Sequence, residues 1–249
     1  MFWISSKKVF WKDLWKDGFM DIHNHLLWGI DDGSKSFKET IALCNAMQDL
    51  GITGAIATPH TYPGMWNNTK ASITTAYSNY RSTTDCLFIK GVSSEYLADV
   101  YLENWIQEKK IVPLPGDYLL IEFSMLFAPT EPVMETLFQL KLKGYRLILA
   151  HPERYLYWKN DLSVFKRLKT FDLYFQINSL SLLGYYGTDV QKLSKQLLDL
   201  DLYDFVGTDT HRIEHLNYTS KIPLNLSTQN IKKMEKLVNA NQEFASSLF

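Results

Sequence analysis

The chain has few cysteines and no long apolar run. Only two cysteines, Cys44 and Cys86, occur in 249 residues, so a disulfide framework is excluded and a reducing compartment is favoured. No stretch approaches the roughly 20 uninterrupted apolar residues of a membrane-spanning helix. The first residues also lack the apolar core and cleavage site of a signal peptide. We therefore expect a cytoplasmic protein that is neither exported nor transmembrane.

The chain also lacks an excess of charge of either sign. Lys and Arg total 26 and Asp and Glu total 27, which gives a formal net charge of −1. The basic residues are spread along the sequence, whereas nucleic-acid-binding domains usually carry a basic patch. Nucleic acid is therefore not expected as a partner.

Several catalytic motifs of phosphatases and hydrolases are absent. A cysteine-dependent tyrosine phosphatase needs Cys-x5-Arg, so that arginine closes the phosphate cradle around a thiolate. Leu50 and Val92 stand six positions after the two cysteines. The sequence also contains no G-x-S-x-G nucleophile elbow and no Walker-type glycine-rich loop. Any phosphoester chemistry must therefore use other groups.

What the chain does contain is an alternation of short apolar segments with helical ones from Phe19 onward. This alternation is typical of βα units around a parallel sheet. One helix is expected to start at a capping box of Ser36 and Glu39 and to end at Gly51. Others are expected over 130–144 and from Thr228. The expected strands are 19–25, 52–58, 86–92, 118–123, 145–150, 173–178 and 203–208. Seven such units predict a parallel α/β barrel, which commonly forms one domain at this length.

Residues 1–18 precede the expected barrel, which spans 19–249. They alternate large apolar residues with lysines, as a short amphipathic helix does. The apolar residues are Trp3, Phe10, Trp11, Leu14 and Trp15, and the lysines are Lys7, Lys8, Lys12 and Lys16. This amphipathic extension either lies on the barrel or contacts a membrane surface or a partner.

Polar residues follow the successive expected strands. They are His23, His25, His60, Glu95, Glu122, His151, Asn178, Asp209 and His211. The carboxyl ends of the strands of a parallel barrel converge on one face, which carries the active site. We therefore expect residues spread over most of the sequence to meet in one pocket.

The residue types in this set indicate a metal centre. His23 and His25 are two positions apart, as are Asp209 and His211, so each pair points to one side of its strand. Buried imidazoles and carboxylates are costly to crowd together unless they are paired or bind a cation. Nitrogen and oxygen donors without thiolate suit Mn²⁺, Fe²⁺ or Zn²⁺. Taken alone, Glu95 and Glu122 each have an alternative role as a solvated loop charge or as part of a structural ion pair.

Other residues are expected around this pocket. Asp31 and Asp32 lie in a Gly-rich turn, where either they have a turn role or one of them reaches a metal. Arg154 is placed to clamp phosphate oxygens, and Arg212 is a second candidate; surface ion pairs are the alternative for both. Tyr62 and Trp66 are placed either to frame a substrate ring or to pack at the rim.

Seven motifs in order along the chain carry a resemblance to a known family. They are Asp21-Ile-His-Asn-His25, Gly29-Ile-Asp-Asp-Gly33, Ala57-Thr-Pro-His60, Ile121-Glu-Phe-Ser124, Ala150-His-Pro-Glu-Arg-Tyr155, Gln176-Ile-Asn178 and Gly207-Thr-Asp-Thr-His211. Together they resemble the polymerase and histidinol phosphatase (PHP) superfamily. Within it, the chain is similar to the bacterial manganese-dependent protein-tyrosine phosphatases of capsule and exopolysaccharide loci. Trp28 and Arg212 depart from the residues usual in that family.

The resemblance implies a distorted TIM-like (β/α)7 barrel of the PHP type with two or three Mn²⁺ ions. The implied ligands are His23, His25, Glu95 and Asp209 for the first ion, Glu95, Glu122 and His151 for the second, and Asp32, His60 and His211 for the third. Glu95 would bridge two ions and Arg154 would bind the phosphate, which makes them the expected catalytic residues.

The resemblance also implies a substrate, the phosphotyrosine-bearing tail of a membrane-associated tyrosine autokinase that controls polysaccharide export. A hydroxide activated by the metals would attack phosphorus without a covalent intermediate. A small-molecule phosphoesterase such as a histidinol-phosphate phosphatase is the main alternative. A metal-dependent amidohydrolase and a barrel that only binds a partner are two others.

Overall fold

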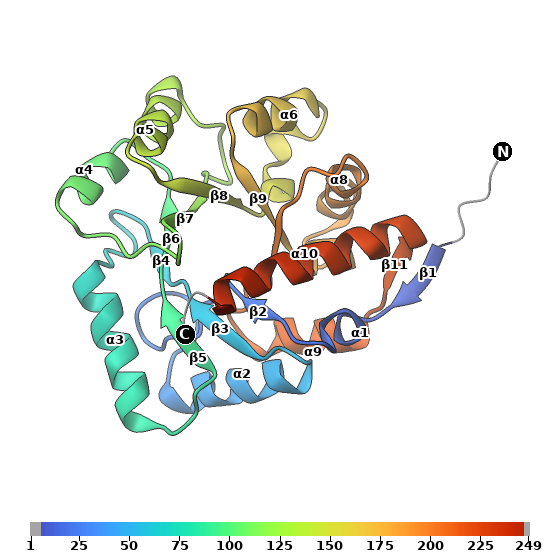
Figure 1. Cartoon of the computed structure of the whole chain (residues 1–249), viewed down its shortest axis with the longest axis horizontal. Helices are drawn as coiled ribbons and strands as arrows, with labels where there is room; N and C mark the ends of the chain where they lie inside the picture. The colour runs from blue at the N-terminus through green and yellow to red at the C-terminus, as the bar shows by residue number, and fades with distance from the viewer. Residues whose placement is uncertain (1–5, 247–249) are drawn as a thin grey trace.

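The computed structural model describes residues 6–246 and shows a mixed α/β fold around a curled, parallel sheet (Figure 1). The parallel strands are β2 (Met20–Asp21), β3 (Gly54–Ala57), β4 (His60–Thr61), β5 (Ile89–Val92), β6 (Glu95–Leu97), β7 (Tyr118–Glu122), β8 (Arg146–Ala150), β9 (Tyr174–Asn178) and β10 (Phe205–Gly207). Six of them pair in the order β10-β9-β8-β7-β6-β4, and three in the order β2-β3-β5. The expectation of a parallel α/β architecture is confirmed.

Two of the expected strands continue past a break. Thr58 and Pro59 separate β3 from β4, and Ser93 and Ser94 separate β5 from β6. At the first break, Pro59 has no N–H to donate to a strand ladder, which interrupts regular pairing. The sequence prediction ended these strands at 58 and 92, but the chain resumes pairing at the edge where the polar residues gather.

Backbone hydrogen bonds also link the first and last of these strands. Asn24, just after β2, bridges in parallel to Thr210, just after β10. The His25 amide donates to the Thr210 carbonyl at 2.9 Å, and on the other side the Thr58 amide donates to the Asn24 carbonyl at 2.9 Å. The carboxyl ends of the strands therefore approach one another around a common centre.

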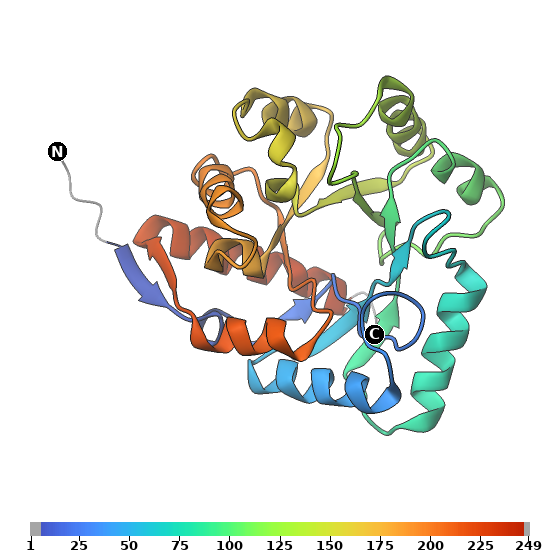
Figure 2. The same ribbon diagram turned by 180° about the vertical axis from the view of Figure 1, so that it is seen from behind.

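Helices cover the outside of this sheet (Figures 1 and 2). They are α2 (Phe37–Asp49), α3 (Lys70–Thr83), α4 (Leu102–Gln107), α5 (Glu131–Leu142), α6 (Ser163–Thr170), α7 (Ser179–Leu183), α8 (Thr188–Asp199) and α9 (Ile213–Lys221), whereas α10 (Thr228–Ser246) lies across one end of the sheet. At the start of α2, Ser36 Oγ accepts from the Glu39 amide at 3.3 Å as expected. The Glu39 carboxylate accepts from the Lys35 amide instead of that of Ser36, so the capping box is shifted by one residue. Gly51, with a φ of +92°, follows the helix.

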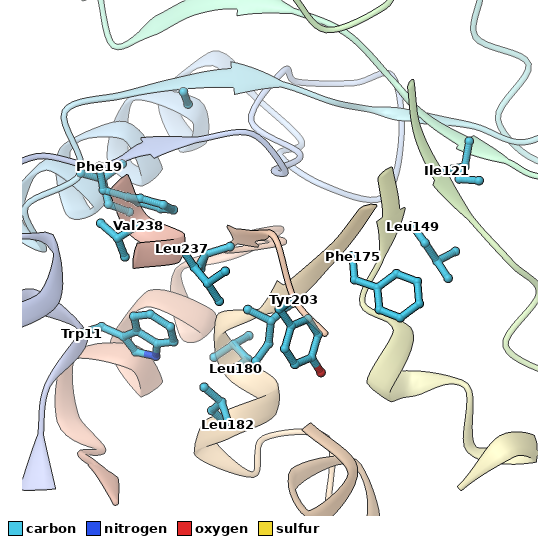
Figure 3. Close-up of a cluster of buried hydrophobic side chains, with 14 of the residues drawn as sticks. Trp11, Phe19, Ile121, Leu149, Phe175, Leu180, Leu182, Tyr203, Leu237 and Val238 are labelled. Atoms are coloured by element: carbon cyan, nitrogen blue, oxygen red, sulfur yellow. The ribbon is translucent and has the colours of Figure 1, made fainter. Parts of the chain in front are cut away.

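The core has two layers, one on each side of the sheet. The larger layer lies between strands and helices and includes Ile121, Leu149 and Phe175 (Figure 3). The smaller one fills the space inside the curl with Met20, Ile56, Leu120 and Ile148 among others. Because both faces of the strands are buried, they read as continuous apolar runs in the sequence.

The C-terminal helix closes one end of the curl. In Figure 1, α10 crosses in front of the strands. Phe244 packs at a centroid distance of 5.3 Å against both Tyr118 and Phe205, which begin β7 and β10. Asn241 Nδ2 donates to the carbonyl oxygens of Met20 at 2.9 Å and Val206 at 2.7 Å. Since α10 occupies the end where the strands begin, only the opposite end is free for a site.

The segment before the expected barrel is packed against it. Strand β1 (Ser6–Val9), which the sequence did not predict, pairs antiparallel with β11 (Leu224–Ser227). The expected helix is short, α1 (Trp11–Trp15), and Trp11 and Trp15 are fully buried. Trp11 Nε1 donates to the carbonyl of Ser179 at 3.1 Å. These rings lie on the barrel and are not available to a membrane surface, whereas Trp3 lies outside the described residues. Within residues 6–246, no helix has the length and hydrophobicity needed to cross a bilayer.

Candidate metal centre

The first group of candidate ligands brings together both ends of the chain. His23 and His25 are fully buried and follow β2, and Asp209 follows β10. Asp209 Oδ1 lies 3.4 Å from His23 Nε2 and 3.3 Å from His25 Nε2. Glu95 Oε2 lies 3.1 Å and 3.4 Å from the same two nitrogens. Four buried ligand atoms therefore surround one point.

These contacts are close, yet several of the atoms are not satisfied by hydrogen bonds. Among residues 6–246, His23 Nε2, His25 Nε2, His60 Nδ1 and Glu95 Oε2 are buried atoms that lack a partner in hydrogen-bond geometry. Ligands about 2.1 Å from a cation at 90–110° to one another lie roughly 3.0–3.4 Å apart. The observed separations match this spacing, so the residues fit a metal ion.

Two further groups share members with the first. His60 Nδ1 lies 3.1 Å from Glu95 Oε2 and 3.3 Å from Glu122 Oε1. His151 Nε2 lies 3.0 Å from Glu95 Oε1 but 4.0 Å from Glu122 Oε2. The distances therefore group His60, more closely than His151, with the two glutamates.

The third group is the one open to solvent. Asp32 Oδ1 lies 3.6 Å from His60 Nε2 and 3.5 Å from His211 Nε2, and the Asp32 side chain is 49% exposed. His25 belongs to this group as well as to the first. All nine expected ligands thus meet at this end of the sheet, and their division among individual ions stays a prediction.

The histidines are oriented by two neighbours, Asp31 and Gln176, whose orienting role was not predicted. Asp31 Oδ2 accepts from His25 Nδ1 at 2.7 Å and from the His60 amide at 3.0 Å. Gln176 Oε1 accepts from His23 Nδ1 at 2.7 Å. Because these acceptors bond to Nδ1, the Nε2 atoms of His23 and His25 face the centre, where a cation would displace their protons. In the sequence, Asp31 is marked by its position beside Asp32, and Gln176 is marked as the first residue of the Gln-Ile-Asn motif.

Backbone conformation contributes to this placement. His151 and Asp209 have φ values of +36° and +53°, which residues other than glycine rarely adopt. His151 follows β8 directly, and Asp209 follows β10 after a single residue. At both positions the chain must turn the side chain inward. Gly33 has a different constraint, since a Cβ there would lie 2.2 Å from the His25 carbonyl oxygen. The turn that carries both aspartates therefore fits only glycine at this position.

The electrostatics of the cluster favour charged carboxylates. Burial alone would raise the pKa of Asp209 and of Glu95, but the neighbouring imidazoles outweigh burial and hold both pKa values well below the ordinary range. Burial would likewise lower the pKa of His23, but Glu95 and Asp209 raise it to about 9. Without a cation, the cluster therefore retains protons on imidazole that a metal ion must displace.

Arg154 lies beside this cluster, on the short 3-10 turn (Pro152–Arg154) that follows β8. Its Nη1 donates to Asp209 Oδ2 at 2.9 Å, and its guanidinium lies 4.5 Å from the centroid of the Tyr186 ring. Asn178 Nδ2 donates to the same Asp209 oxygen at 2.9 Å and to Tyr186 Oη at 3.3 Å. The Arg154 side chain is 25% exposed, so part of it faces the solvent side of the site.

A cavity of about 240 Å³ opens over the cluster. It is lined by Asp32, His60, Tyr62, Met65, Trp66, Glu95, Glu122, Met125, His151, Arg154, Asp209 and His211. Trp66 stacks on the His60 ring at a centroid distance of 4.6 Å, and Tyr62 meets Trp66 edge-on. Arg212 is not in this lining; its Nε donates to His215 Nε2 at 3.2 Å, and its role in substrate binding stays a prediction. A larger hollow of about 500 Å³ lies away from the cluster, between α1, α2 and α9.

Comparison with known proteins identifies the family. A family model described as "Capsular polysaccharide synthesis, CpsB/CapC" matches residues 19–241. The chain belongs to the CpsB/CapC family. The resemblance of its motifs to capsule-locus phosphatases is confirmed.

Curated relatives of this CpsB/CapC chain carry the name tyrosine-protein phosphatase. It is 30% identical over 207 residues to the putative tyrosine-protein phosphatase CapC of Staphylococcus aureus, covering 81% of this chain and 80% of that one. It is 29% identical to tyrosine-protein phosphatase YwqE of Bacillus subtilis, over 92% of this chain and 86% of that one. For tyrosine-protein phosphatase CpsB of Streptococcus pneumoniae, the identity is 29% over 78% and 84% of the two chains.

A solved structure shares the fold of the CpsB/CapC chain. It comes from work on YwqE of Bacillus subtilis and CpsB of Streptococcus pneumoniae, described as unique metal-dependent tyrosine phosphatases. The TM-score is 0.74 at 27% sequence identity, with 91% of each chain covered.

Proposed function

We propose that this CpsB/CapC protein is a metal-dependent protein-tyrosine phosphatase. The observation that carries the proposal is the set of buried, unpartnered nitrogen and oxygen atoms that face one another beneath a cavity with an arginine in its wall. Four imidazole or carboxylate atoms lie at metal-ligand spacing, and burying such atoms together is costly unless they pair or bind a cation. The names of the relatives support this assignment.

The donor set fits two or three divalent cations held by the residues of the three groups. We infer that the ions are Mn²⁺, because of the family resemblance. Fe²⁺ and Zn²⁺ are also compatible with these nitrogen and oxygen donors. When bound, the cations would lower the pKa of a water molecule to supply the nucleophile and would offset charge on the phosphoryl group. Glu95, which faces four histidines, is placed to contact more than one ion.

The chain's own residues would then bind and orient the phosphoester. Arg154 is held by Asp209 on one side and by the Tyr186 ring on the other, which limits the motion of its guanidinium. A preorganised guanidinium can stabilise phosphoryl oxygens in the transition state without reorganising first. Tyr62 and Trp66 would frame the phenyl ring, and we retain Arg212 as a further candidate for contact with substrate. The phenolate leaving group, with a pKa of about 10 for its acid, needs less help from a general acid than an alkoxide does.

The finer features of the fold belong to the same proposal. We infer a seven-unit, distorted barrel of the PHP type, supported by the bridge from Asn24 to Thr210 and by the two broken strands. We also retain residues 1–18 as an extension of a barrel domain over 19–249. The substrate would be the phosphotyrosine-bearing tail of a bacterial tyrosine autokinase in the cytoplasm, and its dephosphorylation would tune capsular or exopolysaccharide synthesis.

The test is turnover by the full chain after chelator treatment and reloading with Mn²⁺. We expect metal-dependent hydrolysis of phosphotyrosine peptides, with a loss of about 100-fold in Arg154→Ala because one transition-state contact disappears. His23→Ala should lose metal as well as activity. Arg146→Ala is the matched control, since Arg146 is exposed at the opposite end of β8.

Two results would contradict the proposal. Preferred turnover of histidinol phosphate would assign the site to a small metabolite, and metal binding without any phosphoester turnover would leave only a binding role. A trapped phosphorylated residue, with a burst of product equal to the enzyme, would contradict direct attack by water.

A further inference from the structure

Three strongly exposed apolar side chains belong to the two loops that supply Met65 and Met125 to the cavity lining. Leu126 is 87% exposed, the highest value for a large apolar residue in the part of the chain that the structure describes. Phe127 is 63% exposed and Met65 is 60% exposed. Exposed apolar side chains that occur singly need no explanation, but adjacent ones beside a functional site mark a binding surface.

These residues belong to two loops that flank the same cavity. Met65 lies in the loop after β4 and itself lines the cavity. Met125 lines the cavity from the loop after β7, and Leu126 and Phe127 follow it directly in sequence. Strand β6 separates β4 from β7 in the sheet, so the two loops are close neighbours at one edge of the site.

Both loops are held in place by their own hydrogen bonds. The amide and carbonyl groups of Tyr62 and Trp66 bond reciprocally at 2.9 Å and 2.8 Å, which fixes Met65 in a tight turn. In the other loop, the Leu126 amide donates to Ser124 Oγ at 3.2 Å, and Tyr157 Oη donates to the Ser124 carbonyl at 3.2 Å. A surface that is already ordered loses little conformational entropy when it binds a ligand.

We propose that Met65, Met125, Leu126 and Phe127, called here the apolar rim, bind an apolar side chain adjacent to the phosphotyrosine of a peptide substrate. This inference rests on the proposed phosphatase function and adds a preference for sequence around the phosphorylated residue. Met65 and Met125 of the rim line the cavity that would hold the phosphotyrosine, and Leu126 and Phe127 directly follow Met125, so the rim begins where the phosphotyrosine site ends.

The charge around the rim favours a peptide over a membrane. Residues 61–69 and 123–130 contain no Lys, Arg, Asp or Glu. Surfaces that bind anionic lipid usually combine apolar side chains with lysine or arginine, which both loops lack. A second copy of the chain is also disfavoured. The three exposed side chains could each bury about 200 Å² at most, less in total than the roughly 800 Å² per partner of a stable interface.

The test compares two phosphotyrosine peptides of equal charge with the metal-loaded full chain. One peptide has leucine on both sides of the phosphotyrosine and the other has serine, and p-nitrophenyl phosphate reports on the site without a peptide. We expect Leu126→Ser combined with Phe127→Ser to raise KM for the leucine peptide by roughly ten-fold, because apolar burial is lost. The serine peptide and p-nitrophenyl phosphate should be hydrolysed as before. Leu142→Ser, at a position 66% exposed at the far end of α5, is the matched control and should change none of the three.

The outcomes separate failure of the rim from failure of the proposed function. Equal KM for the two peptides in the unmodified protein, or an equal change on all three substrates in the variant, would overturn the rim while the phosphatase function stands. No hydrolysis of any aryl phosphate would overturn both. If the protein cosedimented with phosphatidylcholine or phosphatidylglycerol vesicles and this depended on Leu126 and Phe127, the ligand of the rim would be a membrane and not a peptide. If the unmodified protein were a dimer and the double variant a monomer, the ligand of the rim would be a second copy of the chain.

Discussion

Asp31 and Asp32 are neighbours in sequence and have opposite surroundings. The Asp31 carboxylate is buried and bonds to His25 Nδ1, to the His60 amide and, at 2.9 Å, to the Gly33 amide. The Asp32 carboxylate is half exposed and faces His60 and His211. Burial would raise the pKa of Asp32, but the hydrogen bond and charge of His211 and the other imidazoles lower it to about 2. One aspartate thus orients ligands and the other is placed as a ligand.

The role of Asp31 leads to a prediction for Asp31→Asn. An amide can present its nitrogen to His25 Nδ1, which would disfavour the tautomer with a free Nε2, so metal affinity should fall by about ten-fold to 100-fold. Calorimetric titration of the chelator-treated protein with Mn²⁺ measures this change. Asp85→Asn, on an exposed residue, is the control and should bind as the parent does. Unchanged affinity in Asp31→Asn would show that the aspartate has only a structural part in its turn.

At the scale of elements, α10 and the metal cluster occupy opposite ends of the curled sheet. The helix packs Phe244 against the first residues of β7 and β10, whereas the ligands follow the last residues of the strands. This separation allows the stability of the fold to be changed at one end without altering the geometry of the other.

Phe244→Ala tests that separation. Removing a ring that is 3% exposed leaves a cavity, and we expect the free energy of unfolding to fall by about 3 kcal/mol. Urea denaturation of the metal-loaded protein measures the loss, and Phe138→Ala, at a ring 43% exposed, is the control. Metal content and kcat of the folded protein should stay unchanged. A loss of metal in Phe244→Ala would show instead that the two ends are coupled.

At the scale of the whole molecule, the metal centre connects stability to pH. In the metal-free chain the folded state raises the pKa of His23 from 6.5 to about 9. The proton on His23 therefore stabilises the fold fully below about pH 6.5, and this contribution is lost as the pH rises towards 9. Bound cations replace such protons, so metal affinity should increase over the same range.

We expect the Tm values of the metal-free protein and of the Mn²⁺-loaded protein to diverge as the pH rises from 6.5 to 9. The Tm of the chelator-treated protein should fall with rising pH through the loss of the His23 proton, while the increase in Tm on adding Mn²⁺ should grow. Differential scanning calorimetry measures both. His23→Gln should weaken the pH dependence of the metal-free protein, since the titrating imidazole is gone. If Tm changed with pH in the same way with and without metal, the proposed linkage between protonation and metal binding would be wrong.

The sequence by itself determined the parallel α/β class and the identity of the candidate ligands. Alternation of apolar strands with helices is a local pattern, and so is the two-residue spacing of His23 with His25 and of Asp209 with His211. Parallel strands bring their carboxyl ends to one edge whatever the details of packing. That topological rule was enough to gather nine residues from seven segments into one site.

Only the tertiary structure decided how those residues meet. His60 lies nearer to Glu122 than His151 does, and Gln176 reaches His23. Both contacts depend on the curl of the sheet over tenths of an ångström. The burial of Trp11 and Trp15 depends on distant segments, such as the start of α7, which lies 168 residues after Trp11 in sequence. Their amphipathic pattern therefore left two interpretations open. The apolar rim was also not visible in the sequence, because exposure is a property of packing between distant segments and not of local periodicity.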